Sequence, residues 1–420
     1  MDTSPMRVHC LGSCQEVGRS CFLVETDQRT LFDYGLKIYS RQNPKKQNLM
    51  PLPYQGDIDA MVLSHAHLDH SGCIPELYTR PPVHWFGTPP TMEIASLLWA
   101  DSLKIMGEDS PYQEMHVNRA ENRYAPLLYE QVLSLGDTDY SLHDAGHILG
   151  SAMVKAKHNG KTLLYSGDFK MGDTRMHKGA VPPEEADYLI LESTYSNREH
   201  PNREELEKKL ISTIEETIDL GGTVLLPAFA VGRSQELLSV LHSRLRGIPV
   251  FLDGMSKAVT NIYLNNDDYI RDPKSFREAA QETIFADSIR DKKDATAEPS
   301  IIVSTAGMME GGPALRYLQH LNPASRLIFT GYNVEGTNGW RILNQSKALV
   351  DGYELEVSVP ADYLDFSAHV GHSGLVDFVK KVNPEKIILN HGDDTPGFAQ
   401  ELAGMGFDAV APKNGDTIDL

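Results

Sequence analysis

The chain has 420 residues, 41% hydrophobic and 23% charged, which is typical of a soluble globular protein large enough for two domains. Its formal net charge of −19 argues against a generally basic surface of the kind that coats nucleic acids. No apolar run approaches the roughly 18 to 20 residues of a membrane span, and the opening residues MDTSPM lack a leader pattern, so we expect a cytoplasmic protein without a membrane partner.

The first part of the chain predicts strands. Apolar runs at 8–11, 20–25 and 30–32, separated by turn residues, indicate a meander that would form half of a sheet sandwich. Residues 39–56 are polar and contain proline, as loops do, and the apolar run 58–63 indicates a buried strand. The four cysteines show no paired spacing of the structural-zinc kind, so we expect reduced thiols in the core.

The residues after this buried run, SHAHLDHSG at 64–72, place three imidazoles and a carboxylate within six positions. Because side chains of an extended segment alternate, His65 and His67 point the same way and could bind one metal ion. Asp69 and His70 lie where the chain turns toward a helix expected to begin near Gly72, and could reach a second ion. Imidazole nitrogen and carboxylate oxygen suit zinc better than manganese or iron. A solvated polar loop would explain a lone His-x-His, but not the full string.

Further ligands are expected downstream, because one short segment cannot supply six. Strands are predicted at 140–143, 152–157 and 162–166, and each ends near a candidate ligand. His147, in DAGH, is the natural third ligand of the first metal, and Asp168, in YSGD, is a carboxylate that could bridge both metals. Strand ends that deliver ligands to one edge are what a sandwich with a site at the sheet edge requires.

The rest of the chain predicts a helix over 91–106, a partly helical span to residue 135, and then a change of pattern from residue 188. Beyond it, strands are predicted at 223–226, 249–252, 300–304 and 326–329, and amphipathic helices run through 206–218 and 234–245. This alternation predicts a parallel α/β layer in a second domain. Residues 264–298 are charged and are interpreted as irregular solvated surface with no site.

The ordered motifs of the first half resemble the metallo-β-lactamase superfamily. They are Asp33 in LFDYG, the histidine string at 65–70, His147 and Asp168. The resemblance implies a binuclear zinc hydrolase, with manganese as the alternative ion, whose metal ligands would be His65, His67, Asp69, His70, His147 and Asp168. Asp33 would be an orienting carboxylate that fixes the tautomer of a metal-bound histidine.

Three further motifs narrow the resemblance to the β-CASP nucleases, the branch that includes ribonuclease J and the nuclease of the cleavage and polyadenylation specificity factor. They are Glu192 at a strand end, His369 in FSAH and His391 in LNHG. In that family the third motif is typically histidine in RNA-directed members, so His391 favours RNA. With Asp69 and His70, His391 would complete the coordination of the second metal. The match spans nearly the whole chain.

The resemblance implies hydrolysis of RNA phosphodiester bonds. Two metals about 3.5 to 4 Å apart can lower the pKa of a bridging water to about 7 and neutralise phosphate oxygens, which supplies hydroxide for an in-line attack. His369, oriented by the Glu192 carboxylate, would donate the proton to the leaving ribose oxygen. Asp69, Glu192 and His369 are therefore the predicted catalytic residues, and the products would be a 3′-hydroxyl and a 5′-phosphate.

Two loops of the second domain are candidates for RNA phosphate contact. Arg233 follows a predicted strand in PAFAVGRSQE, and the glycine-rich turn STAGMMEGG begins with Ser304 and Thr305, before a helix expected near Pro313. Backbone amides at a helix N-terminus bind phosphate. Close packing of the turn and pairing of Arg233 with Glu236 are the alternatives.

Other functions stay open at this point. A thioesterase or lactonase could use the same metals, and some relatives that have lost ligands are non-catalytic subunits of RNA-processing complexes. The inserted domain argues against a small substrate, and no ligand is missing here. The sequence does not separate endonuclease from 5′-to-3′ exonuclease action. RNA is the expected partner, with other RNA-processing or decay proteins and a second copy in a homodimer as further expectations.

Taken together, the resemblance implies a fold of the α/β class, a metallo-β-lactamase four-layer αββα sandwich with an inserted β-CASP α/β domain. The expected divisions are residues 1–195 for the first part of the metallo-β-lactamase domain, 196–365 for the β-CASP domain, and 366–420 for the C-terminal part of the first domain. RNA would then enter a seam between the domains, and opening of that seam is a further expectation.

Overall fold

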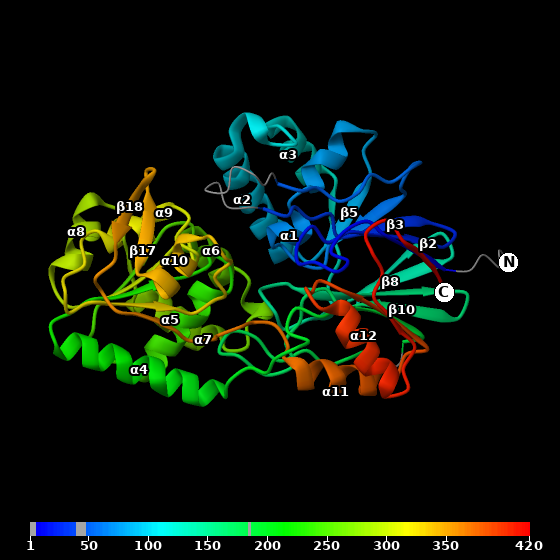
Figure 1. The fold of residues 1–420 in the computed structure, drawn as a ribbon. Helices are drawn as coiled ribbons and strands as arrows, with labels where there is room; N and C mark the ends of the chain where they lie inside the picture. Colours follow the sequence, from blue (N-terminus) through cyan, green and yellow to red (C-terminus); the bar gives the residue numbers. More distant parts are fainter. Residues whose placement is uncertain (1–5, 39–47, 184–185) are drawn as a thin grey trace.

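Two lobes lie side by side in the computed structural model, which describes residues 6–38, 48–183 and 186–420 (Figure 1). The larger lobe holds two seven-stranded sheets, and the smaller lobe holds one six-stranded sheet and a two-stranded hairpin. The chain leaves the second sheet of the larger lobe after β11 (Tyr188–Glu192) and re-enters it at β20 (Lys386–Asn390). Among the described residues, no helix combines the length and the hydropathy of a membrane span.

The first sheet contains the predicted N-terminal meander. Its strand order is β22-β1-β2-β3-β4-β5-β6. The strands are β1 (Arg7–Cys10), β2 (Phe22–Glu25), β3 (Arg29–Phe32), β4 (Ala60–Val62), β5 (His84–Gly87), β6 (Tyr124–Pro126) and β22 (Thr417–Asp419). The pairs β1–β2 and β2–β3 are antiparallel, which confirms the meander, and β3 to β6 run parallel.

The second sheet brings together strands from both ends of the chain. Its order is β21-β20-β11-β10-β9-β8-β7. The remaining strands are β7 (Val132–Leu135), β8 (Thr138–Asp144), β9 (Ala152–His158), β10 (Lys161–Tyr165) and β21 (Ala409–Val410). The neighbours β10, β11 and β20 are parallel, with Tyr165 opposite Ile190 and Glu192 opposite Asn390. Their carboxyl ends therefore reach the same edge of the sheet.

Helices cover the outer faces of the two sheets. Residues from both sheets, among them Phe22, Tyr140 and Leu163, fill the layer between them. On the first sheet pack α2 (Pro89–Met106) and α3 (Glu114–Asn122), and on the second pack α11 (His372–Val382) and α12 (Thr395–Gly404). This arrangement confirms the four-layer αββα sandwich. The four cysteines form no disulfide and are buried in it, as expected.

The smaller lobe is the predicted parallel α/β layer. Its strand order is β14-β13-β15-β12-β16-β19, and every pair is parallel. The strands are β12 (Val224–Pro227), β13 (Val250–Asp253), β14 (Ile284–Phe285), β15 (Ile301–Ser304), β16 (Arg326–Phe329) and β19 (Ala361–Tyr363), and the hairpin is β17 (Lys347–Val350) and β18 (Tyr353–Glu356). The helices are α4 (Arg203–Asp219), α5 (Arg233–Arg244), α6 (Ser256–Leu264), α7 (Pro273–Glu282), α8 (Ile289–Ala297), α9 (Gly312–Leu318) and α10 (Asn338–Gln345).

Two details of the sequence prediction are wrong. Residues 264–298 were expected to be irregular, but they contain α7, β14 and α8, whose exposed side chains are largely charged. The side chains of Asp272 and Ser288 accept hydrogen bonds from the amides of Ser275 and Asp291 and so cap the two helices. The helix that was expected to begin near Gly72 instead ends there. It is α1 (Leu68–Ser71), and a 3-10 helix over Ile74–Thr79 follows it.

Candidate metal centre

Most of the predicted ligands lie in loops that follow strand ends at one edge of the sandwich, and Asp69 and His70 lie on the short helix α1. Asp168, Glu192 and His391 emerge together because β10, β11 and β20 are parallel neighbours. His65 follows β4 in the other sheet, and His147 follows β8. The convergence expected from the sequence is therefore a direct result of the sheet order.

Seven side chains form two clusters of candidate metal ligands. His65, His67, His147 and Asp168 each offer one atom, and these atoms lie within 4.8 Å of one another. Asp69, His70 and His391 form a second cluster by the same measure. Oδ2 of Asp168 is 3.6 Å from Nε2 of His65, and Oδ1 is 3.4 Å from Nε2 of His70. Asp168 thus faces both clusters, which is the position that a bridging carboxylate needs.

Hydrogen bonds at Nδ1 hold four of the five imidazoles of the two clusters with Nε2 toward the centre, whereas Nδ1 of His67 lies 3.2 Å from Nε2 of His147. Nδ1 of His70 donates to Asp33 at 2.6 Å, and Nδ1 of His147 donates to the Ala368 carbonyl at 2.9 Å. Nδ1 of His65 contacts the Ser64 hydroxyl at 3.1 Å, and Nδ1 of His391 contacts the Thr194 hydroxyl at 3.0 Å. Outer partners of this kind fix which nitrogen remains free to bind a metal.

Asp33 is the hub of one set of these bonds. Its carboxylate accepts hydrogen bonds from the Ser64 amide and hydroxyl and from the Tyr165 hydroxyl, each at 2.7 Å, as well as from His70. The three residues that make these four hydrogen bonds are buried around it. Its position is the one expected of an orienting carboxylate rather than of a ligand.

Charge and burial in the clusters suit a metal cation. Burial lowers the pKa of His65 well below its usual value and that of His67 to about 4, so both imidazoles are neutral, as ligands must be. Burial opposes ionisation of Asp168, but neighbouring positive charge outweighs burial and holds its pKa well below the usual range, so a negative carboxylate lies between the two clusters.

Two buried atoms of the clusters have no hydrogen-bond partner among the described residues: Nε2 of His65 and Oδ1 of Asp168. Leaving a buried polar atom unsatisfied costs about 1–3 kcal/mol, so native proteins rarely do so without a functional reason. Imidazole and carboxylate donors with these two free positions fit a zinc ion in each cluster.

Glu192 and His369 form a pair beside the clusters. Nδ1 of His369 lies 3.1 Å from Oε2 of Glu192, which also accepts from the Thr194 hydroxyl, while Oε1 accepts from the Phe169 amide. Burial opposes protonation of His369, but the charges of Glu192 and Asp168 outweigh it and raise the pKa of His369 to about 9. Asp168, Glu192 and His369 also offer atoms within 4.8 Å of one another. Because both Glu192 oxygens already accept protein donors, its arrangement favours positioning of His369.

The predicted phosphate-contacting residues lie outside these clusters. Arg233 donates through Nη1 to the Thr330 carbonyl, and burial and the charge of Arg203 lower its pKa to about 10. The alternative partner Glu236 is engaged by Arg203 instead.

At the glycine-rich turn, Ser304 is fully buried, and the Thr305 amide donates to the Asp253 carbonyl. The helix that follows, α9, has only seven residues. The structure therefore does not favour the predicted phosphate contact at Ser304 and Thr305, and close packing explains the turn.

The sequence analysis missed several residues that act on the motif side chains. Ser64, Tyr165 and Thr194 supply the hydroxyls described above, and Nζ of Lys170 donates to the His369 carbonyl at 2.8 Å. Burial and the charge of Arg203 lower the pKa of Lys170 to about 8. Each residue lies within three positions of a motif residue, and that adjacency was the only signal.

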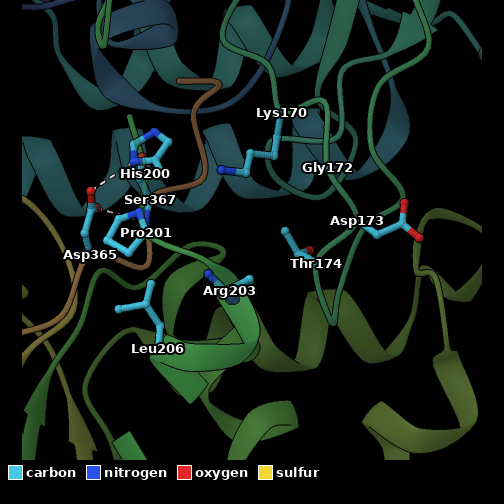
Figure 2. Close-up of a pocket in the computed structure, with 10 residues that line it drawn as sticks. All are labelled: Lys170, Gly172, Asp173, Thr174, His200, Pro201, Arg203, Leu206, Asp365 and Ser367. Carbon is cyan, nitrogen blue, oxygen red and sulfur yellow. Dashed lines mark hydrogen bonds and ion pairs between the residues drawn. The ribbon is translucent and has the colours of Figure 1, made fainter. Parts of the chain in front are cut away.

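A small cavity opens beside the loop that carries His369 (Figure 2). Its volume is about 110 Å³, and Lys170, His200, Arg203, Asp365 and Ser367 are among the residues that line it. His200 pairs with Asp365 at 2.9 Å. Segments of both lobes meet here, so the cavity marks the seam between them next to the clusters.

Models of known protein families match three stretches of the chain. Residues 16–177 match the metallo-β-lactamase superfamily, residues 234–342 the Beta-Casp domain, and residues 355–412 the Zn-dependent metallo-hydrolase RNA specificity domain.

Curated relatives match nearly all of the chain. Probable RNase MJ4 of Methanocaldococcus jannaschii is 35% identical over 99% of this chain and 100% of its own length. RNase aCSPSF2 of Saccharolobus solfataricus is 33% identical over 98% of this chain and 84% of its own length. Transcription termination factor FttA of Methanosarcina mazei is 34% identical over 93% of this chain and 67% of its own length. Among solved structures, a protein of unknown function from Enterococcus faecalis V583 shares the fold, with a TM-score of 0.68 and 14% identity over 99% of this chain and 100% of that one.

Proposed function

The chain belongs to the β-CASP branch of the metallo-β-lactamase superfamily, and from this premise we propose that it is a metal-dependent ribonuclease that hydrolyses RNA phosphodiester bonds. RNA as the substrate is supported by the relatives named as RNases and by the match to an RNA specificity domain. The proposal includes both endonuclease and 5′-to-3′ exonuclease action.

The observation that carries the proposal is the position of Asp168 between two clusters of metal-binding side chains. One zinc ion would be held by His65, His67 and His147, the other by Asp69, His70 and His391, with Asp168 shared. Ions bound there would lower the pKa of a water molecule and neutralise phosphate oxygens at neutral pH. Manganese could occupy the same ligands.

The remaining chemistry belongs to the chain itself. Glu192 holds Nδ1 of His369, which leaves Nε2 free to give a proton to the ribose oxygen that departs. The bond to phosphorus breaks on the side of that oxygen, so the products are a 3′-hydroxyl and a 5′-phosphate. Buried Asp33 keeps His70 in the tautomer that binds metal.

The test is a paired loss of metal and RNA cleavage. Substituting Asp69→Asn and His70→Ala together should reduce the metal content from about two ions to about one per chain and abolish cleavage, because two-metal hydrolysis needs both ions. The control is His143→Ala, since His143 pairs with the exposed Glu130 and lies outside the clusters. Undiminished cleavage by the double variant would refute the proposal.

The mode of cleavage is tested with three forms of one RNA: 5′-phosphorylated, 5′-hydroxyl and circular. Cutting of the circle requires endonuclease action, because the circle has no end. Progressive release of nucleotides from the 5′-phosphorylated form alone would establish exonuclease action.

A further inference from the structure

A row of aromatic side chains leads from His369 onto the smaller lobe. The ring of Tyr195 lies 5.7 Å from that of His369. The guanidinium of Arg198 lies 4.2 Å from the centroid of the Tyr195 ring and 5.7 Å from that of Tyr332. Arg198 thus links a ring beside the metal centre to a ring on the other lobe.

The row continues to Phe229. A Cβ atom placed on Gly331 would lie 2.8 Å from Cε2 of Phe229, so the Phe229 ring covers the backbone next to Tyr332. Phe229 follows β12 and Tyr332 follows β16, and these two strands are parallel neighbours. Both residues therefore lie just past the ends of neighbouring strands, at the carboxyl edge of the six-stranded sheet.

These rings are open to solvent. Tyr332 is 52% exposed, Phe229 37% and Tyr363 39%. Tyr363 lies on the neighbouring strand β19, opposite Phe329 of β16. Single exposed aromatic residues are ordinary on protein surfaces, but a contiguous exposed group next to a catalytic centre marks a binding site.

We propose that Tyr332 and Phe229 bind nucleobases of single-stranded RNA by stacking, with Arg198 adding a cation beside Tyr332. This inference rests on the proposed function, and it identifies the nucleobases as the part of the RNA that the smaller lobe binds. Aromatic faces stack on any base, and an arginine beside them contributes both charge and a planar surface. Because the row begins at His369, the bound bases belong to nucleotides close to the scissile bond.

Stacking also answers a difficulty posed by the charge of the protein. A chain with a net charge of −19 gains little from general attraction to phosphates. Base stacking contributes affinity that depends weakly on charge, so an acidic protein can hold RNA through a short row of rings.

The experiment measures the dissociation constant of a short fluorescein-labelled single-stranded RNA in a His369→Ala background, which slows cleavage and leaves the metal ligands in place. Tyr332→Ala should weaken binding about 5- to 100-fold, whereas Tyr332→Phe, which keeps the ring, should bind as the parent does. The matched control is Tyr353→Ala, since Tyr353 is 75% exposed on the hairpin strand β18 and lies outside the row.

A second arm uses RNAs of the same sequence with one base removed at each position in turn. At one position of the RNA, removal of the base should weaken binding to the parent protein as much as the substitution Tyr332→Ala does. The same removal should not weaken binding to the Tyr332→Ala variant any further. The inference is overturned if Tyr332→Ala binds intact RNA as tightly as the parent, or if every base removal weakens parent and variant equally.

These readouts are separate from the test of the proposed function. Binding is measured without turnover. If Tyr332→Ala and base removal weaken binding as expected, the stacking site is supported even when the intact protein with its metals fails to cleave RNA. Conversely, cleavage by the intact protein together with unchanged binding by Tyr332→Ala would leave the ribonuclease proposal intact and remove the stacking site.

Discussion

Glu192 is a buried carboxylate whose hydrogen bonds suit the orientation of a neighbouring side chain better than the binding of a metal. It is 1% exposed, and its oxygens accept hydrogen bonds from the Phe169 amide, the Thr194 hydroxyl and Nδ1 of His369. We therefore expect Glu192 to act through His369, as a positioning residue.

From this we predict that Glu192→Gln slows RNA cleavage about 100-fold or more, because His369 loses both its orientation and the negative charge that favours its protonated form. The double variant with His369→Ala should be no slower than His369→Ala alone, since the two residues form one unit. The measurement is kcat on RNA, with metal content determined on the same samples.

The control for this prediction is a phosphodiester with an aryl leaving group. Such a group leaves without needing a proton, so both variants should lose much less activity on it than on RNA. A fall in metal content in Glu192→Gln would instead make Glu192 a ligand and contradict the positioning role.

At this scale the sequence predicted the histidines and carboxylates of the clusters and the orienting carboxylates Asp33 and Glu192, but not the hydroxyl groups that hold them in place. The string at 65–70 is recognisable because four metal-binding side chains are consecutive or nearly so. Tyr165 and Thr194 are ordinary residues in sequence, and their roles arise from contacts with Asp33 and His391, far away along the chain. Only the fold reveals such contacts.

The helix that carries Asp69 and His70 depends on the element packed against it. With four residues, α1 cannot be stable alone, and the side chain of its N-cap residue, His67, makes no capping hydrogen bond. Nε1 of Trp99, on α2, donates to the Ser71 carbonyl at 2.9 Å, and Trp99 also packs on Trp85 at 5.8 Å between ring centroids. Trp99 thus ties the metal-binding turn to the core.

We therefore predict that Trp99→Ala lowers the free energy of unfolding by about 3–5 kcal/mol, from the cavity and the unsatisfied carbonyl. Zinc affinity should fall as well, because α1 loses its support. Urea denaturation and competition with a chromogenic chelator measure the two effects. Trp99→Phe should recover most of the packing.

The matched control is Trp340→Ala on α10, a half-buried tryptophan in the other lobe. It should cost less stability and leave zinc affinity unchanged. A loss of zinc affinity as large as that of Trp99→Ala would show that the effect is a general loss of stability.

The elements themselves were predicted well where apolar residues form a run or a wide stripe. The buried strands β12, β15 and β16 appear as such runs. Helix α7 was missed because only Phe276, Ala279 and Ala280 are buried in it, which leaves too narrow a stripe among charged residues. The position of α1 was missed because a single turn has no period to detect.

The two lobes are held together by polar bonds near the metal centre. Glu236, on α5 of the smaller lobe, is 6% exposed and accepts hydrogen bonds from the amides of Arg175 and Met176 in the larger lobe, each at 3.0 Å. Arg203 pairs with the same carboxylate. The Arg271 amide donates to the Met176 carbonyl, and the Leu149 amide donates to the Tyr263 hydroxyl.

The sequence predicted a seam between the lobes in which RNA would bind, but it could not identify what closes that seam. Arg175 and Met176 contribute backbone amides, and amides carry no signature in a sequence. Glu236 was considered as a partner of Arg233, because the two are three positions apart on one helix. In the folded chain it faces the other lobe instead.

Glu236→Ala should loosen the seam, because it leaves two amides and the Arg203 guanidinium without their acceptor. We predict that the amides of Arg175 and Met176 exchange hydrogen about 10- to 100-fold faster, while core strands such as β10 exchange at the parent rate. Mass spectrometry of exchanged peptides gives both values. Glu282→Ala is the matched control, since Glu282 pairs with His242 at the exposed end of α7.

If RNA enters by opening of the seam, Glu236→Ala should also associate with RNA faster than the parent in stopped-flow measurements. Unchanged exchange at these amides would mean that other contacts hold the lobes together, and faster exchange without faster association would mean that RNA reaches the metal centre through the closed seam.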